Sequence, residues 1–452
     1  MKTEIIHNSI PGPDDITRKV LPNGIVVLSR SNFHSSSIVI SGYVAAGSQF
    51  DPPGKLGLTH FTALGLMRGT QTSDFQTLYE RLESAGASLG FGASVHTTSF
   101  SGRALVEDLP LLLSTLEECL TRPTFPTAQI HRLKNQLLTG LAIRAQNTGD
   151  MAALEFDSLL FPNHPYGRPE DGYTETINAI TRADLVCYHR KHFSPTGMVI
   201  AIVGAIHPQK SVEMVETVFG GFAAGQKVEI PSFPEILPPS EKIVRQVIIK
   251  GKSQSDLVMG TLGPKRKSPD YLAASLGNSI LGQFGLMGRI GDAVREKAGL
   301  AYYASTSLNA WKESGSWEVS AGINPGNVER AAALITSELR RFTSELVSEE
   351  EITDNQNNYI GRMPLSLESN SGVANSILNL ERFDLGLDYL QHYPSLIRAV
   401  TREQVLEAAR LHINRRDGSC YSPPSALTAE AGEIPAYLNW RDYRPNLHVC
   451  QG

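Results

Sequence analysis

Residues 80–94 read ERLESAGASLGFGAS, and residues 293–307 read AVREKAGLAYYASTS. Each stretch begins as a helical run, reaches an Ala-Gly pair, and continues with small and aromatic residues that suit a strand. Residues 99–120 and 316–339 then both read as a strand, a short turn and an amphipathic helix. In the second of these helices one apolar stripe recurs at helical spacing, formed by Val328, Ala331, Ala332, Ile335 and Leu339. The sequence therefore predicts two similar halves.

A proline-rich segment separates the two halves. Residues 228–241 read VEIPSFPEILPPSE, with prolines at positions 231, 234, 238 and 239. Clustered prolines fix φ and remove backbone donors, so this segment is expected to be an extended linker. We therefore expect an N-terminal domain at residues 1–227, a linker at 228–241 and a C-terminal domain at 242–452.

Several strands can be predicted from local pattern. Residues 24–29 (GIVVLS) follow a Pro-Asn-Gly turn, residues 37–44 (SIVISGYV) alternate in polarity, and residues 198–206 (MVIAIVGAI) read as a buried strand. Strands and helices segregate within each half and do not alternate strictly. This order favours an α+β fold with largely antiparallel sheets. No Gly-x-Gly-x-x-Gly segment opens a helix, and no phosphate-binding loop is present.

Composition excludes several classes of protein. Of the 452 residues, 41% are apolar and 19% charged, and the formal net charge of −5 gives no basic footprint for nucleic acid. No apolar run approaches the roughly 20 residues that a membrane-spanning helix needs. The four cysteines, Cys119, Cys187, Cys420 and Cys450, are scattered without paired spacing, and the N-terminus has no apolar signal core. We therefore expect a cytoplasmic protein.

Residues 57–70 read GLTHFTALGLMRGT and carry the most specific resemblance in the chain. Similar support comes from residues 83–91 (ESAGASLGF), 122–126 (RPTFP), 161–169 (FPNHPYGRP), 192–204 (HFSPTGMVIAIVG) and 295–306 (REKAGLAYYAST). The chain resembles the pitrilysin-like metallopeptidases, which carry the inverted zinc motif His-x-x-Glu-His. Within that family it is most similar to the short, two-repeat branch of processing-peptidase subunits and respiratory-complex core proteins. The resemblance implies a clam-shell of two α+β halves.

Mapped onto that family, the zinc site is degenerate. His60 holds the first histidine position, but Ala63 stands in place of the glutamate and Leu64 in place of the second histidine. The family's third ligand, a later glutamate, corresponds to Gly140, and residues 131–149 contain no acidic residue. A catalytic zinc needs about three protein ligands and a general base beside its water. We therefore expect no metal in this chain, and His60 to be a partly buried, hydrogen-bonded histidine.

Two other sources of chemistry are poor candidates. Cys187, His189 and His192 form the densest cluster of metal-ligating residue types, but their spacing does not bring all three to one helix face. No Gly-x-Ser-x-Gly nucleophile motif is present. An autonomous peptidase with altered chemistry therefore has no candidate site. Residues 161–169, which include His164, are expected to form a surface loop.

A second family feature is intact. Arg295 and Tyr302, seven positions apart, match the Arg/Tyr pair that faces the zinc site in the family, with Arg295 in the last turn of a helix closed by Gly299 and Tyr302 on the next strand. The resemblance implies that they bind the substrate backbone and steady the oxyanion, tasks that suit an arginine fork and a phenol.

The resemblance implies a non-catalytic, substrate-binding subunit of a heteromeric zinc endopeptidase, which contributes Arg295 and Tyr302 to peptide hydrolysis. The resemblance implies a partner subunit of the same family that carries His-x-x-Glu-His and holds the zinc. The alternative is a catalytically dead structural, assembly or peptide-binding protein, related to the respiratory-complex core proteins and able to form a homodimer.

Overall fold

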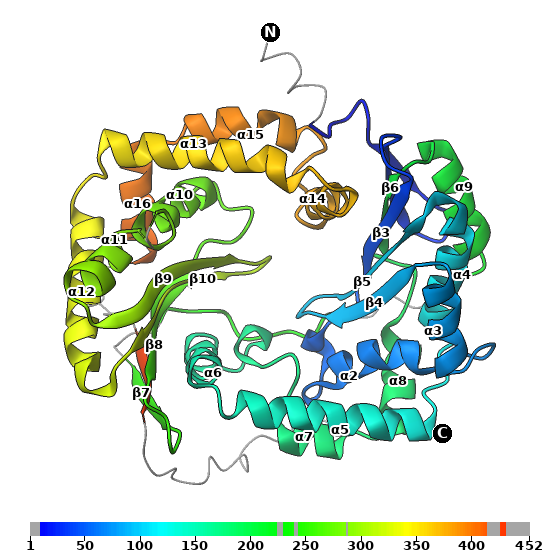
Figure 1. Cartoon of the computed structure of the whole chain (residues 1–452), viewed down its shortest axis with the longest axis horizontal. Helices are drawn as coiled ribbons and strands as arrows, with labels where there is room; N and C mark the ends of the chain where they lie inside the picture. The colour runs from blue at the N-terminus through cyan, green and yellow to red at the C-terminus, as the bar shows by residue number, and fades with distance from the viewer. Residues whose placement is uncertain (1–9, 224–228, 239–242, 286–287, 414–424, 431–452) are drawn as a thin grey trace.

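The computed structural model describes residues 10–223, 229–238, 243–285, 288–413 and 425–430. Two β-sheets lie on opposite sides of the molecule, with helices α6 (Thr148–Leu160) and α14 (Asn370–Arg382) between them (Figure 1). The predicted α+β class with largely antiparallel sheets is confirmed.

The first sheet has six strands in the order β1-β2-β6-β3-β5-β4. Its strands are β1 (Thr17–Val20), β2 (Val26–Ser31), β3 (Ser37–Val44), β4 (Ser88–Ala93), β5 (Thr98–Leu105) and β6 (Val199–Gly204). All neighbours are antiparallel except β2 and β6. The strands predicted at residues 37–44 and 198–206 are confirmed as β3 and β6.

Side-chain alternation along β3 divides two cores. Ile38 and Ile40 point into the core under the helices of this half, whereas Val39 and Tyr43 point to the opposite face. The helices are α2 (Leu58–Gly65), α3 (Phe75–Ser84), α4 (Leu109–Thr121), α5 (Thr127–Arg144), α7 (Thr174–Ala179), α8 (Arg182–His192) and α9 (Pro208–Phe219).

The second sheet has the order β7-β11-β8-β10-β9. Its strands are β7 (Val244–Ile248), β8 (Ser255–Gly263), β9 (Ala301–Ala310), β10 (Gly315–Ile323) and β11 (Ser425–Glu430). The remaining helices are α10 (Tyr271–Gly282), α11 (Gly288–Gly291), the π-helical turn η6 (Asp292–Lys297), α12 (Val328–Ser344), α13 (Glu349–Ser366), α15 (Tyr389–Arg398) and α16 (Arg402–His412). The apolar stripe predicted on α12 is buried at Val328, Ala331, Ile335 and Leu339.

The two halves exchange helices across the middle of the molecule. Helix α14 packs on the first sheet, where Val373 and Ile377 lie against Val39 and Val203. Helix α6 belongs to the first half but packs on the second sheet, where Phe156 is buried against β8. The described part of the linker, residues 229–238, contains no helix or strand. The predicted domain boundaries remain a prediction.

A buried tyrosine joins the turns of the two hairpins. The Tyr166 hydroxyl accepts a hydrogen bond from the Glu313 backbone N–H at 3.2 Å and lies 2.8 Å from His96 Nε2. His96 belongs to the β4–β5 turn and Glu313 to the β9–β10 turn. Burial lowers the pKa of His96, which favours the neutral ring. With its proton on Nδ1, His96 donates to Gln49 Oε1 at 3.1 Å and accepts from the Tyr166 hydroxyl at Nε2. The Tyr166 ring also packs on Trp311 at 4.7 Å.

The prediction of a surface loop at residues 161–169 is wrong. Phe161, His164 and Tyr166 are 1%, 3% and 5% exposed. The second half of the chain covers them, since Trp311 lies 5.7 Å from the Phe161 ring and Glu313 lies 3.4 Å from His164. This polar, proline-containing stretch is therefore buried by residues of the β9–β10 turn, which are distant in the sequence.

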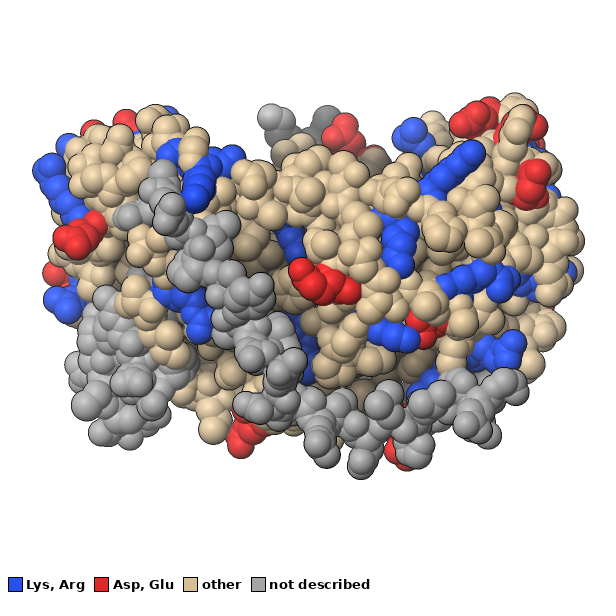
Figure 2. Space-filling model, turned by 90° about the horizontal axis from the view of Figure 1, so that it is seen from below, with Lys and Arg blue, Asp and Glu red and all other residues tan. Residues whose placement is uncertain are grey.

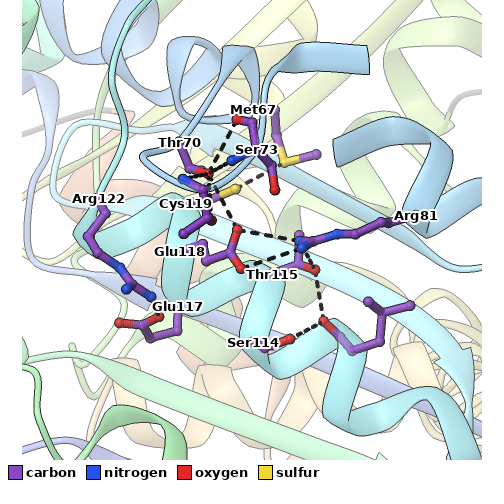
Figure 3. A network of polar contacts seen from close by, with 12 residues as sticks. Met67, Thr70, Ser73, Arg81, Ser114, Thr115, Glu117, Glu118, Cys119 and Arg122 are labelled. Atoms are coloured by element: carbon purple, nitrogen blue, oxygen red, sulfur yellow. Dashed lines mark hydrogen bonds and ion pairs between the residues drawn. The ribbon is translucent and has the colours of Figure 1, made fainter. Parts of the chain in front are cut away.

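Helix α4 is tied to the segment that follows α2 (Figure 3). Arg81 of α3 forms an ion pair with Glu118 at 3.4 Å, and the Thr70 hydroxyl lies 3.4 Å from the same carboxylate. Beside them, the buried Cys119 thiol lies 3.5 Å from the Met67 sulfur. These contacts fix the turn at which α2 ends, so they help to hold α2 in place.

The surface seen from below carries separate Lys and Arg side chains with acidic side chains among them (Figure 2). Over the residues that the structure describes, no helix is both long and apolar enough to cross a membrane.

Tyr166→Phe tests the junction between the halves. The variant keeps the ring but removes the hydroxyl that serves both His96 and the Glu313 N–H, so we expect the free energy of unfolding to fall by about 1–2 kcal/mol. Urea denaturation followed by tryptophan fluorescence measures the loss. Tyr79→Phe, which alters a partly exposed ring on α3, is the matched control and is expected to change stability by less than about 0.5 kcal/mol. Equal stability of Tyr166→Phe and the control would contradict the assigned role.

A carboxyl pair between α6 and β10 predicts a dependence on pH. Burial raises the pKa of Asp157 to about 8, with Glu318 adding to the effect, so folded Asp157 keeps a proton between about pH 4 and 8 that the unfolded chain has released. Its contribution to stability therefore declines as pH rises through that window. Asp157→Asn is expected to gain at least about 1 kcal/mol relative to the native chain between pH 5 and pH 8. Asp354→Asn, at an exposed carboxylate, serves as the control; a pH-independent difference for Asp157→Asn would refute the assignment.

Candidate functional site

Helix α2 is anchored at its N-terminus by a buried carboxylate. Asp51 accepts hydrogen bonds from the backbone N–H groups of Gly57 at 2.9 Å and Thr59 at 3.0 Å, and from the Thr59 hydroxyl at 2.6 Å. These donors stabilise its charge, but burial dominates and raises the pKa of Asp51 to about 7. Gly57 has φ +91°, and a Cβ there would lie 2.7 Å from Ile177, so the entry to α2 requires glycine.

The degenerate motif lies on this helix. His60 is half-buried, as expected, but its ring makes no hydrogen bond with any residue that the structure describes. Burial lowers the pKa of His60, which favours the neutral ring. Ala63 is fully buried, and Leu64 packs against the core of the first half. The positions of the family's base and second histidine therefore contribute apolar contacts to the core.

The position of the third ligand lies on α5, which packs against α2. Gly140 is exposed, and a Cβ at this position would meet no atom within 4 Å. The charge of Asp171 acts on His60 and opposes the effect of burial on its pKa, and Asp171 pairs with Arg144 at the end of α5. Position 140 therefore has room for a larger side chain, but its glycine supplies no ligand.

These residues do not fit a zinc ion. One neutral imidazole, two apolar side chains and a glycine supply a single donor, whereas zinc sites use three or four. Within the described ranges, no group of three or more His, Cys, Asp and Glu side chains could hold a metal ion. The cluster on α8 is engaged elsewhere, because His189 Nε2 lies 2.9 Å from the Leu120 carbonyl oxygen and His192 stacks on Phe50 at 4.5 Å.

Arg295 lies in the π-helical turn η6, which ends before Gly299 at φ +63°. Its side chain is 37% exposed and its ionic contact is with the adjacent Glu296 at 3.5 Å. A neighbouring carboxylate on the surface is a weak partner, so the guanidinium can exchange it for a ligand. Single π-helical turns occur frequently at functional sites.

Tyr302 lies at the start of β9, the edge strand of the second sheet. The β9–β10 register passes from Tyr303 to Ala301, so Tyr302 is the extra residue of a β-bulge. The bulge turns its side chain outward, and Tyr302 is 67% exposed. The structure thus places both members of the Arg/Tyr pair at the surface, on two consecutive elements; their role in binding substrate stays a prediction.

The adjacent tyrosine has a structural role that the sequence did not reveal. Tyr303 donates a hydrogen bond to Asp256 Oδ1 at 2.6 Å, and the Thr148 hydroxyl at the start of α6 donates to the other oxygen. Asp256 therefore ties α6 to the strand that carries Tyr302. Neither contact has a local signal, because the three residues are far apart in the sequence.

Comparisons with protein families agree with this arrangement. Residues 25–166 match the model described as insulinase (peptidase family M16), and residues 179–359 match the model described as the peptidase M16 inactive domain. An uncharacterised zinc protease of Streptomyces coelicolor is 24% identical over 421 residues, which cover 92% of this chain and 91% of that protein. The zinc protease YmxG of Bacillus subtilis is 23% identical over 78% of this chain and 85% of its own length.

Solved structures share the fold over nearly the whole chain. A peptidase M16 inactive domain from Pseudomonas fluorescens has a TM-score of 0.84 and 25% identity, and covers 94% of this chain and 100% of its own. A protease from Helicobacter pylori has a TM-score of 0.83 and 18% identity over 93% of this chain and all of its own. The chain is therefore a member of the pitrilysin-like peptidase family M16.

Proposed function

We propose that this chain is the non-catalytic, substrate-binding subunit of a heteromeric zinc endopeptidase. Family membership supports a peptidase-like or inactive M16 protein. The observation that carries the finer proposal is an asymmetry within one chain. The position of the general base holds Ala63 and two ligand positions hold Leu64 and Gly140, whereas Arg295 and Tyr302 are both present and accessible.

The partner in this proposal is a second M16 chain with an intact His-x-x-Glu-His motif. That subunit holds the zinc and performs the proton transfers, and this chain binds no cofactor. Arg295 offers a rigid fork of donors to a peptide carbonyl, and the Tyr302 phenol supplies a further donor. Both groups act by binding and orienting the peptide, and both stabilise negative charge that develops on the carbonyl oxygen.

Peptide capture by strand addition fits the sheet topology. Within the part of the chain that the structure describes, β4 pairs only with β5 and β9 pairs only with β10, so each of these two hairpin strands ends its sheet with an unpaired edge. Main-chain hydrogen bonds to such an edge give affinity with little dependence on sequence. A cytoplasmic location belongs to the same proposal.

The second candidate is an assembly or peptide-binding homodimer without any role in cleavage. The similarity to the Pseudomonas fluorescens structure, described as an inactive domain, favours it. The loss of zinc ligands fits this function equally well, but it gives no reason for an exposed arginine and tyrosine at the family's substrate-binding positions.

Arg295→Ala and Tyr302→Phe test the role of the pair. In the assembled enzyme each change removes donors to the carbonyl oxygen, so we expect kcat/KM for peptide cleavage to fall tenfold or more. Arg330→Ala, which removes an exposed arginine on α12, and Tyr79→Phe are the matched controls and are expected to retain activity. Turnover that is unchanged in both test variants would remove this role from the pair.

Rebuilding the ligand set tests the placement of the degenerate site. Leu64→His with Gly140→Glu adds two ligands beside His60, and the open space at Gly140 accepts the new side chain. We expect the native chain to retain no zinc after dialysis and the double variant to retain about one ion per chain, measured by mass spectrometry of the metal. Adding His60→Ala to the double variant should abolish binding. Stoichiometric zinc in the native chain, or none in the double variant, would overturn the assignment.

A further inference from the structure

A groove of about 680 Å³ lies between the first sheet and helix α14. The strands next to the free edge form its floor with small residues, Gly90 of β4, Ser99 and Ser101 of β5, and Ser41 of β3. A Cβ at Gly90 would meet no atom within 4 Å, so the floor is open toward the groove. Helix α14 covers the middle of the sheet with apolar side chains and leaves this strip uncovered.

The wall of the groove is the polar face of α14. Asn375, Asn379 and Arg382 recur at intervals of four and three residues and line it together. All three are exposed. The amides of Asn375 and Asn379 and the hydroxyls of Ser41 and Ser101 make no hydrogen bond with any residue that the structure describes. The groove therefore presents a set of unused hydrogen-bonding groups.

Arg382 carries a charge without a counter-ion. Its guanidinium lies 4.8 Å from the centre of the Tyr43 ring, and Nη2 lies 3.4 Å from the Thr97 hydroxyl. The adjacent Glu381 is bound to Arg18 through two hydrogen bonds of 2.8 Å. Across the described residues, no carboxylate lies within ion-pair distance of Arg382. Although Arg382 is accessible from solvent, the neighbouring groups remove part of the water around its guanidinium, and this desolvation lowers the pKa of Arg382.

We propose that this groove is a carboxylate-binding subsite, in which Arg382 pairs with an acidic group of a peptide bound beside β4. Among the described residues that line the groove none is acidic: the lining combines small and polar residues with the apolar Phe91, Phe100 and Leu378, and Arg382 is its one cation. Arginine suits the task because its planar fork binds a carboxylate through two parallel hydrogen bonds. The inference rests on the proposed function, because it assigns an acidic preference to the peptide that this subunit captures.

The carboxylate has two sources within a peptide, a Glu or Asp side chain or the free C-terminus. Arg382 lies near the β4–β5 turn, beside Thr97, and therefore at one end of the β4 edge. If the subsite binds a side-chain carboxylate, Arg382 selects a Glu or Asp at a fixed position along the peptide. If it binds a terminal carboxylate, Arg382 selects peptides whose chain ends at this point.

Fluorescence anisotropy with the full-length chain tests the subsite. The probes are fluorescein-labelled ten-residue peptides of Ala, Ser and Thr, one amidated and neutral, one amidated with a single Glu at successive positions, and one with a free C-terminus. We expect an acidic probe to bind tenfold or more tighter than the neutral probe. A preference confined to the Glu series assigns the subsite to side chains, and a preference confined to the free C-terminus assigns it to chain ends.

Variants separate the subsite from the general capture of peptides. Arg382→Gln is expected to abolish the acidic preference and leave the neutral probe unchanged, and Arg382→Lys to retain part of it. Arg103→Gln removes an exposed arginine from the same sheet face outside the groove and should keep the full preference. Equal binding of acidic and neutral probes to the native chain, or a preference that survives Arg382→Gln, overturns the subsite but leaves the proposed function standing. Failure of every probe to bind contradicts both.

Discussion

The hydroxyl of Tyr166 meets both halves of the chain at once, and the relative position of the two sheets depends on that contact. Its partners, His96 and the Glu313 N–H, lie in the turns of the β4–β5 and β9–β10 hairpins. Each of those hairpins supplies one of the two edge strands of its sheet. A contact that fixes both turns therefore fixes the spacing between the edge that borders the groove and the edge that carries Tyr302. The Asp256 contacts reinforce it, because they attach α6 to the second sheet.

The helix that carries His60 is held in place by contacts that involve no metal. Asp51 still caps α2, and Thr59 still meets the buried Tyr188 hydroxyl at 2.7 Å. Ala63 is fully buried and contributes to the core. A helix stabilised in this way needs no metal to keep its place. The first half can therefore hold its sheet edge and groove in position without chemistry of its own, while the second half presents Arg295 and Tyr302.

Local pattern was sufficient for several elements of the fold. Alternation predicts β3, an apolar run predicts β6, and the Ala-Gly pair at Gly299 predicts the end of the turn that carries Arg295. The same pattern placed both residues of the Arg/Tyr pair, because a helix end and the next strand are local features. Family resemblance placed His60 and Gly140 on two helices that pack together.

What sequence reasoning missed is long-range. Burial of Tyr166 depends on Trp311, which is remote in the sequence, so the proline-containing stretch looked like a surface loop. Packing of α14 on the first sheet joins residues near 377 to residues near 39, and only that packing creates the groove beside Arg382. The bulge at Tyr302 arises from the pairing of β9 with β10, so it cannot be predicted from the sequence of either strand alone.

Purification of the chain from its native source, with zinc content and cleavage of a fluorogenic peptide mixture measured together, tests the central claim most directly. A divided active site predicts that the isolated chain holds no zinc and cleaves nothing, and that a copurifying subunit with His-x-x-Glu-His restores cleavage that a chelator stops. Copurification without such a subunit and without cleavage, or chelator-sensitive cleavage by this chain alone, would contradict it.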